Sequence, residues 1–211
     1  MPGRPPRQGN CTNAIVAITA ATYGLLALLG WTEHADLAGG FIPARLSGFQ
    51  LAGALPVWIT PMTATLLHGG VLHLFFNMLM LLFCGRMVEE RIGPGGIAIL
   101  YVTGAYAAAA AQYLANPADG SPMIGASGAI SAVFAAYALL FGRPRGFAAD
   151  PVIGSAVNIL WLAAAWIGVQ FLMGLAFADM GMAIATAAHV GGFIAGLVFT
   201  RPLAVAWRRD G

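Results

Sequence analysis

The stretch MIGASGAISA, residues 123–132, places the hydroxyl of Ser127 among glycines and alanines at the start of an apolar run. The run covers residues 127–142, and at roughly 1.5 Å per helical residue it is about 24 Å long. The hydrocarbon core of a bilayer is thicker, roughly 30 Å. A helix that ends at the inner surface must therefore begin below the outer one, so we expect Ser127 to face a water-filled hollow rather than lipid.

The composition of the whole chain is typical of a membrane protein. Hydrophobic residues make up 59% and charged residues 9% of the 211 residues, whereas soluble domains have roughly 45–50% and roughly 25%. We therefore predict an all-α polytopic membrane protein with six transmembrane helices. The six apolar runs lie at about 13–30, 66–87, 95–115, 127–142, 152–177 and 182–200.

The arginines predict an orientation, because positive residues gather at the cytoplasmic ends of spanning helices. With a cytoplasmic N-terminus and six crossings, Arg45 is left outside while every other cation of the ten lies inside. This predicts an N-in, C-in protein with short cytoplasmic tails at 1–12 and 203–211 around a helical domain at 13–202. An outer loop at about 31–65, rich in Gly, Pro and aromatic residues, is predicted to be compact and to lie partly in the bilayer interface.

Several classes of partner are disfavoured by the same counts. The net charge of +2 follows from the topology and does not indicate nucleic acid. Cys11 and Cys84 are predicted to be free thiols, far apart in the N-terminal arm and the second run. No cofactor is predicted, and no metal, because no Cys, Asp or Glu accompanies His73 and His189 at ligand spacing. An all-Arg, Ala-rich chain without a transit peptide suggests a bacterial plasma membrane.

Polar side chains inside the predicted spans are few, and each costs roughly 2–3 kcal/mol unless a partner or water satisfies it. Small residues at every fourth position allow close helix packing, and they occur in both the fourth and the sixth run. Packing these two faces together would bring the imidazole of His189 to the hydroxyl of Ser127. The polar residues are His73, Asn77, Ser127, Ser131, Asn158, Gln170 and His189.

A nucleophile, a base within reach and donors around a helix N-terminus are the parts that acyl transfer needs. His73 and Asn77 are four residues apart, so they share one helix face. The N–H of Ser127, at the positive end of its helix, can stabilise an oxyanion together with these two side chains. Each signal is weak alone, since a serine in GASGA more often packs than reacts, and intramembrane histidines also relay protons in channels and transporters.

Three motifs taken together resemble the rhomboid intramembrane serine proteases: HGGVLHLFFNMLMLLFCGRMVEERIG (68–93), GASGA (125–129) and AHVGGFIAGL (188–197). Their order, spacing and helix assignment match over residues from about 10 to 202. The resemblance implies a six-helix bundle with a site that opens to the outer side and substrates that are single-pass membrane proteins. It implies Ser127 as nucleophile, His189 as general base, His73 and Asn77 as oxyanion donors, and Gly125, His68, Glu89 and Gly192 as supporting residues.

Two positions depart from the family pattern. Ser131 stands where the family often has an aromatic residue whose ring packs against the base, and Trp58 is followed by Ile59 where many members have arginine. Two alternative readings remain open at this point: a proteolytically silent rhomboid-like binding protein, and a small channel or transporter that uses the intramembrane histidines. A transporter would more naturally show paired broken helices or an inverted repeat, and we find neither.

Other residues are assigned roles from their position alone. Glu89 and Glu90, with Arg91, are predicted to form a structural ion pair at the inner end of the second run, and Trp166 is predicted to be interhelical or lipid-facing bulk. Asp179 lies too near the surface to orient His189, so a Ser–His dyad is predicted rather than a triad. The fifth run, flanked by Gly154 and Gly174, is the candidate for an element that moves aside for substrate.

Overall fold

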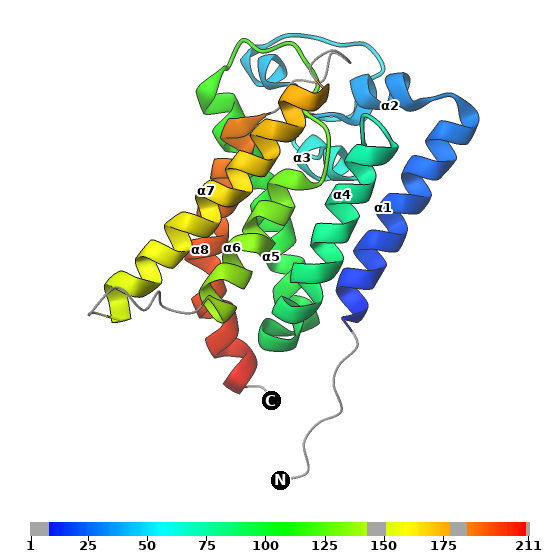
Figure 1. Cartoon of the computed structure of the whole chain (residues 1–211). Coiled ribbons are helices and arrows are strands. Elements are labelled where there is room, and N and C mark those ends of the chain that lie inside the picture. The colour runs from blue at the N-terminus through cyan, green and yellow to red at the C-terminus, as the bar shows by residue number, and fades with distance from the viewer. Residues whose placement is uncertain (1–8, 143–150, 178–184, 210–211) are drawn as a thin grey trace.

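The computed structural model of the protein describes residues 9–142, 151–177 and 185–209, without side chains at 151, 152, 155, 169–177 and 209. Within these ranges the chain is a bundle of helices joined by loops and short helical turns (Figure 1). The long elements are α1 (Asn10–Leu29), α4 (Val71–Met80), the π-helical turn η3 (Leu81–Gly85), α5 (Arg86–Ala115), α6 (Ser127–Phe141), α7 (Pro151–Phe177) and α8 (Thr186–Arg209). The short elements are α2 (Thr32–Gly39), η1 (Pro43–Ser47), α3 (Thr60–Thr63) and η2 (Ala64–Leu66).

A break inside α5 separates the second and third predicted runs. Gly93 has φ 76° and ψ 170° and is followed by Pro94, and this positive φ favours glycine. The ring of Trp207 in α8 occupies the space where a side chain at position 93 would lie. α8 therefore continues to Arg209, beyond the predicted end of the sixth run at 200, because its last turns pack against this break.

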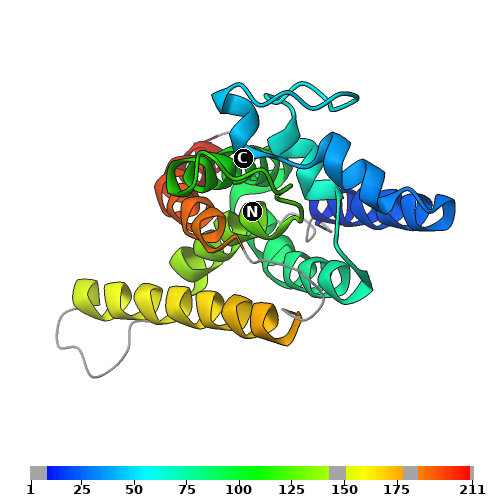
Figure 2. The same ribbon diagram turned by 90° about the horizontal axis from the view of Figure 1, so that it is seen from above.

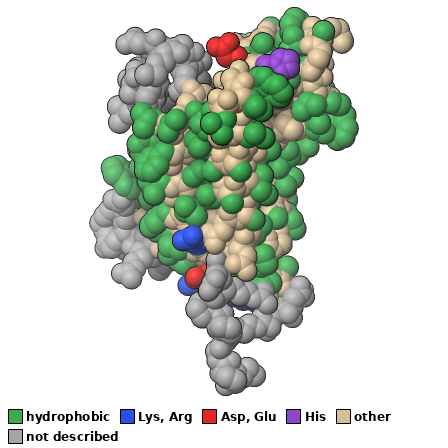
Figure 3. Space-filling model, turned by 90° about the vertical axis from the view of Figure 1, so that its right-hand side faces the viewer, with side chains coloured by type: hydrophobic (Ala, Val, Ile, Leu, Met, Phe, Trp, Pro, Cys, Tyr) green, Lys and Arg blue, Asp and Glu red, His purple; other side chains and the backbone are tan. Residues whose placement is uncertain are grey.

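The surface of the bundle has the apolar character that lipid requires. Asn10–Leu29, Val71–Ala115 and Thr186–Arg208 are long and apolar enough to cross a membrane, and Ser127–Phe141 and Ala156–Gly168 are shorter apolar helices. Figure 3 shows an apolar band along one face, with charged side chains gathered toward its two ends. The predicted all-helical, membrane-type fold is confirmed. Six crossings stay a prediction.

The centre of the bundle is built by small residues that let α5, α6 and α8 approach closely. A Cβ at Gly104 would lie 2.7 Å from Cβ of Ala132, and a Cβ at Gly192 would overlap the carbonyl oxygen of Gly128. α6 lies in the middle of the bundle (Figure 2), and Ile130 on it is fully buried. The predicted packing of the fourth run on the sixth through their small faces is therefore present.

The outer loop is more helical than predicted, and the second span begins later. α4 starts at Val71 rather than at 66, because α3 is a separate short helix with Pro61 in its first turn, and Gly69 and Gly70 interrupt the chain after η2. One bond lies within the loop, from Arg45 Nη2 to the carbonyl of Leu55 at 2.7 Å, and a second ties the loop to α5, from the Tyr106 hydroxyl to the carbonyl of Trp58 at 3.0 Å.

The outer loop also carries a carboxyl group with an altered affinity for protons. Partial burial, and secondarily the charge of Glu33, raises the pKa of Asp36 to about 6, compared with about 3.9 in an unfolded chain. Between these two values the folded protein binds more protons than the unfolded chain, so stability falls as the pH rises from about 4 to about 6.

We therefore expect Asp36→Asn to raise the unfolding temperature at pH 7.5 and to remove this pH dependence. The gain should be less than about 1 kcal/mol, because the half-exposed carboxylate is partly screened by water. Thermal unfolding in detergent between pH 4 and 8 measures it, with Glu90→Gln, an exposed carboxylate, as control. An Asp36→Asn profile with the wild-type slope would contradict the assignment.

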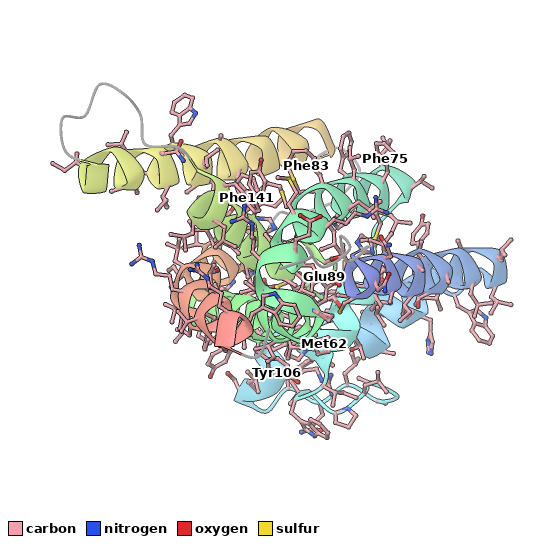
Figure 4. All side chains as sticks on the ribbon, turned by 90° about the horizontal axis from the view of Figure 1, so that it is seen from below. Met62, Phe75, Phe83, Glu89, Tyr106 and Phe141 are labelled. Atoms are coloured by element: carbon pink, nitrogen blue, oxygen red, sulfur yellow. The ribbon has the colours of Figure 1, made fainter. Side chains whose placement is uncertain are left out.

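At the end of the bundle where α1 begins, Glu89 caps this helix, and the predicted ion pair with Arg91 is wrong for Glu89. The Glu89 carboxylate is 4% exposed and accepts bonds from the N–H of Cys11 at 3.0 Å, the N–H of Thr12 at 2.8 Å and the Thr12 hydroxyl at 2.7 Å. The first N–H groups of a helix lack intrahelical partners and carry partial positive charge. Figure 4 shows Glu89 beside the start of α1. Arg91 instead lies over the Phe141 ring, 4.9 Å from its centroid.

The cysteines lie closer together than predicted. Both thiols are free, as predicted. Their predicted separation was wrong, because Cys11 belongs to the first turn of α1 and not to a separate N-terminal arm. That turn packs beside η3, which holds Cys84: a Cβ at Gly85 would lie 2.8 Å from Cγ2 of Thr12.

Removal of the Glu89 carboxylate should strongly destabilise the protein. Glu89→Ala leaves two buried donors of Thr12 and the part-buried N–H of Cys11 without their acceptor, and we expect it to lower the free energy of unfolding by about 2–5 kcal/mol. Glu89→Gln keeps one acceptor oxygen and should lose less. Unfolding by denaturant in micelles measures both, with Glu90→Ala at the exposed neighbouring position as control. Equal stabilities of Glu89→Ala and Glu90→Ala would contradict the capping role.

Candidate active site

Ser127 is the first residue of α6, as the short apolar run predicts. The chain before it, from Asn116 to Ala126, is not helical, and it is tied to the outer loop by the bond from the Gly125 N–H to the carbonyl of Ala64 at 2.9 Å. The N-cap residue Ala126 makes no side-chain capping bond. The N–H groups of this first turn, at the positive end of the helix dipole, therefore remain available to an anionic group beside Ser127.

His189 lies against Ser127, across the close contact between α6 and α8. Its Nε2 is 2.7 Å from Ser127 Oγ, within hydrogen-bond range, and the imidazole is 5% exposed. Nδ1 of His189 has no hydrogen-bond partner among the described residues, and Asp179 lies outside them. When Ser127 donates its proton to Nε2, the neutral imidazole carries its own proton on Nδ1.

His73 lies next to the loop that precedes Ser127, at Gly125. Its Nδ1 accepts the N–H of Gly69 at 3.4 Å, so the neutral ring carries its proton on Nε2. A Cβ at Gly125 would lie 2.8 Å from that Nε2, and Gly125 has φ +110°. Only glycine suits both this conformation and this contact, and its absence of a side chain lets the imidazole of His73 approach the chain two residues before Ser127.

Asn77 and His68 support His73 from two directions. Asn77 is buried and its Nδ2 donates to the carbonyl of His73 at 2.9 Å, so one of its two N–H groups is engaged within α4. The His68 ring lies edge-on to His73, with centroids 4.9 Å apart. Burial, with a smaller contribution from His73, lowers the pKa of His68 to about 3, so His68 is neutral near pH 7. Ser127, His189, His73, Gly125 and His68 are thus gathered in one region, with Asn77 bonded to its own helix, whereas the predicted supporting residue Glu89 lies apart from them, at the start of α1.

Sequence reasoning missed the contact made by Trp166. Its indole N–H donates to Ser131 Oγ at 2.8 Å, and Ser131 Oγ donates to the carbonyl of Ser127 at 2.8 Å. The Trp166 ring stacks on Phe134, with centroids 5.0 Å apart and planes at 24°. The sequence gives one signal for it, a small hydroxyl residue four positions after Ser127 with a tryptophan in the following apolar run.

A separate cavity of about 310 Å³ lies between α1, the α3–η2 turn and α5, and it does not include Ser127 or His189. Within the part of the chain that the structure describes, no three His, Cys, Asp or Glu side chains lie close enough to hold a metal ion. The site described above consists of protein groups from α4, α6 and α8 together with the loop before α6. Its lining holds a hydroxyl, two imidazoles and helix-terminal N–H groups, which are the groups of acyl-transfer chemistry.

Comparison with known proteins gives a consistent result. The family model described as "Rhomboid domain" matches residues 56–205. A protein of Pectobacterium atrosepticum named "Rhomboid protease GlpG" is 28% identical over 194 residues, which cover 91% of this chain and 62% of that protein. Proteins of the same name from Enterobacter sp. and Haemophilus influenzae are 32% and 30% identical over 142 residues, 64% of this chain and 45% and 64% of theirs. The chain therefore spans less than two thirds of the length of these relatives.

Proposed function

The chain belongs to the rhomboid family, and on that premise we propose that it is an intramembrane serine endopeptidase with Ser127 as nucleophile and His189 as general base. The observation that carries the proposal is the 2.7 Å contact between Ser127 Oγ and His189 Nε2. This contact lies at the start of a helix too short to span the hydrocarbon core. A hydroxyl hydrogen-bonded to a neutral imidazole is the arrangement that activates a serine.

The reaction has two halves. Ser127 Oγ attacks the scissile carbonyl carbon while its proton passes to His189 Nε2, and the resulting imidazolium then protonates the leaving amine as the peptide bond breaks. A water molecule next loses a proton to His189 and attacks the acyl-enzyme, which releases the carboxylate product and returns the proton to Ser127 Oγ. No carboxylate is required to orient His189, because the tight packing of α8 on α6 fixes its position. A dyad therefore suffices in this proposal.

The oxyanion formed in each half is stabilised by groups around the start of α6. The Ser127 N–H supplies one bond with the helix dipole behind it, and the Nε2–H of His73 supplies a second across Gly125. Asn77 contributes as a third donor through the second N–H of its amide, since only one of the two is bonded to the carbonyl of His73.

The substrate class follows from the depth of the site. A spanning helix buries its scissile carbonyls in its own hydrogen bonds, so it must unwind before Ser127 can attack. We propose single-pass membrane proteins that carry helix-weakening residues near the outer leaflet. The proposal includes six crossings with both termini inside a bacterial plasma membrane and the site open to the periplasmic side. The start of α1 and the end of α8 lie at one end of the bundle (Figure 1), which supports an even number of crossings.

The test is cleavage of model substrates in proteoliposomes that contain the purified protein. A panel of single-span substrates with Gly-, Ala- or Ser-rich segments near the outer surface should yield one product pair in the membrane. The same segments in soluble fusion proteins should be cleaved far more slowly. A silent binding relative would retain these substrates without cleavage, and a channel would pass protons without cleavage. Either result would overturn the proposal.

A further inference from the structure

The cavity of about 310 Å³ between α1, the α3–η2 turn and α5 lies apart from the candidate active site. Its walls include Ile15 and Ile18 of α1, Met62 and Leu66 of the turn, and Ala98 and Val102 of α5. Small-molecule pockets in proteins begin at roughly 300 Å³, and a dry apolar cavity of roughly 150 Å³ already binds benzene. The space is therefore large enough for a slender ligand.

The surface that lines the cavity is apolar throughout. The Thr63 hydroxyl donates to the carbonyl of Gly39 at 2.6 Å. The Thr65 hydroxyl donates to the carbonyl of Met62 at 2.8 Å, and the buried Tyr101 hydroxyl adds no polar surface to the cavity. A buried water molecule needs roughly two to four polar partners, so water is not held here. An empty cavity would leave the lining atoms without dispersion contacts.

The cavity reaches the outer surface of the bundle at α1 and α5. Ile18 and Val102 line it and are also 57% and 40% exposed. Ile18 lies near the middle of α1, which is at the edge of the bundle (Figure 2), and α1 and α5 both belong to stretches long and apolar enough to cross a membrane. The mouth of the cavity therefore lies at the depth of the hydrocarbon core, where lipid acyl chains surround the protein.

We propose that this cavity binds one acyl chain of a bilayer phospholipid, which enters between α1 and α5. An acyl chain is slender and entirely apolar, so it gains dispersion contacts with the lining and leaves no polar group unsatisfied. The ester groups and the headgroup of the lipid stay outside, because the cavity offers them no hydrogen-bond donor.

The α3–η2 turn connects this lipid site to the chain before Ser127. The carbonyl of Ala64, in the turn, accepts the N–H of Gly125 at 2.9 Å, and Met62 and Leu66 of the same turn form a wall of the cavity. A bound acyl chain thus packs against the turn that holds Gly125. It also stabilises the folded protein, since the site exists only where its three walls are assembled.

The experiment uses a phosphatidylcholine that carries a photoreactive diazirine midway along one acyl chain, in vesicles that contain the protein. Light should produce adducts on Met62 and Leu66 in wild type, besides those on exposed residues such as Leu28, which is 87% exposed. Ala98→Leu places a larger side chain in the cavity, so adducts on Met62 and Leu66 should fall about fivefold or more relative to those on Leu28. Ala110→Leu, at an exposed position of the same helix, should leave this ratio unchanged.

Thermal unfolding in detergent gives a second measurement. Added phosphatidylcholine should raise the unfolding temperature of wild type and of Ala110→Leu, and Ala98→Leu should lose the larger part of this rise because its side chain already takes up the space. Ala98→Val is a smaller change that replaces Ala98→Leu if that variant does not fold, and its adducts should fall by less.

Two results would overturn the lipid site. The first is adducts on Met62 and Leu66 that are missing in wild type or as frequent in Ala98→Leu as in wild type. The second is an equal gain in unfolding temperature for wild type and Ala98→Leu. Neither measurement uses cleavage, so both are independent of the reaction proposed at Ser127.

Discussion

Alanine at Ser127 or at His189 is expected to lower kcat/KM for a membrane-spanning substrate by about 10⁴-fold or more, and the double variant is expected to lose no more than either single variant. In the proposed mechanism the two side chains share one proton transfer through the 2.7 Å contact between Oγ and Nε2. Residues that act as a unit in this way show strongly non-additive losses, because the first substitution already removes the activated nucleophile.

Kinetics in proteoliposomes measure these losses, and unfolding temperatures show whether each variant is folded. Alanine at either position removes few contacts, so the variants should remain folded. Residual activity from the oxyanion donors should remain similar in all three. A His189→Ala protein that cleaves at the wild-type rate would remove the base from the mechanism. A double variant far below both single variants would show that the two side chains act separately.

Gly192→Ala, outside the reacting groups, is expected to cause a large loss of cleavage activity. A Cβ at position 192 would overlap the carbonyl oxygen of Gly128 and lie 3.3 Å from Cβ of Ser131. Backbone cannot yield as a flexible side chain does, so α8 must move away from α6. Displacement of His189 by about 1 Å costs about 10²-fold in rate, and overpacking costs about 1–3 kcal/mol of stability.

The matched control is Gly24→Ala, since a Cβ at Gly24 in α1 would meet nothing within 4 Å. Alanine has a higher helix propensity than glycine, so this control should keep wild-type activity and equal or higher stability. The measurements are kcat/KM in proteoliposomes and the unfolding temperature in detergent. Wild-type activity in Gly192→Ala would show that the close contact of α6 and α8 does not position His189.

Local patterns in the sequence predict much of this arrangement. The short apolar run places the start of a helix at Ser127, and small residues four positions apart predict that α6 and α8 pack closely enough to bring His189 to Ser127. These predictions succeed because helix periodicity fixes which neighbouring residues share a face, and bilayer thickness fixes how long a spanning helix must be. The predicted start of the second span at 66 fails because the apolar residues before Val71 belong to short turns of the outer loop.

Contacts between distant polar groups could not be predicted in the same way. Glu89 reads as a surface charge beside Arg91, yet its partners are N–H groups of α1, 77 and 78 positions away in the chain. The bond from Trp166 to Ser131 depends on the angle at which α7 crosses α6, which no local pattern specifies. The amide of Asn77 shares a helix face with His73, as the spacing predicts, but the sequence does not show that it bonds to the carbonyl of His73.

The most direct measurement is labelling of the protein in bilayers by a small fluorophosphonate, with the modified residue located by peptide mass spectrometry. A hydroxyl at the start of α6, activated by His189, predicts a single adduct on Ser127 in wild type and almost none in His189→Ala. An adduct on another residue, or equal labelling of wild type and His189→Ala, would contradict it.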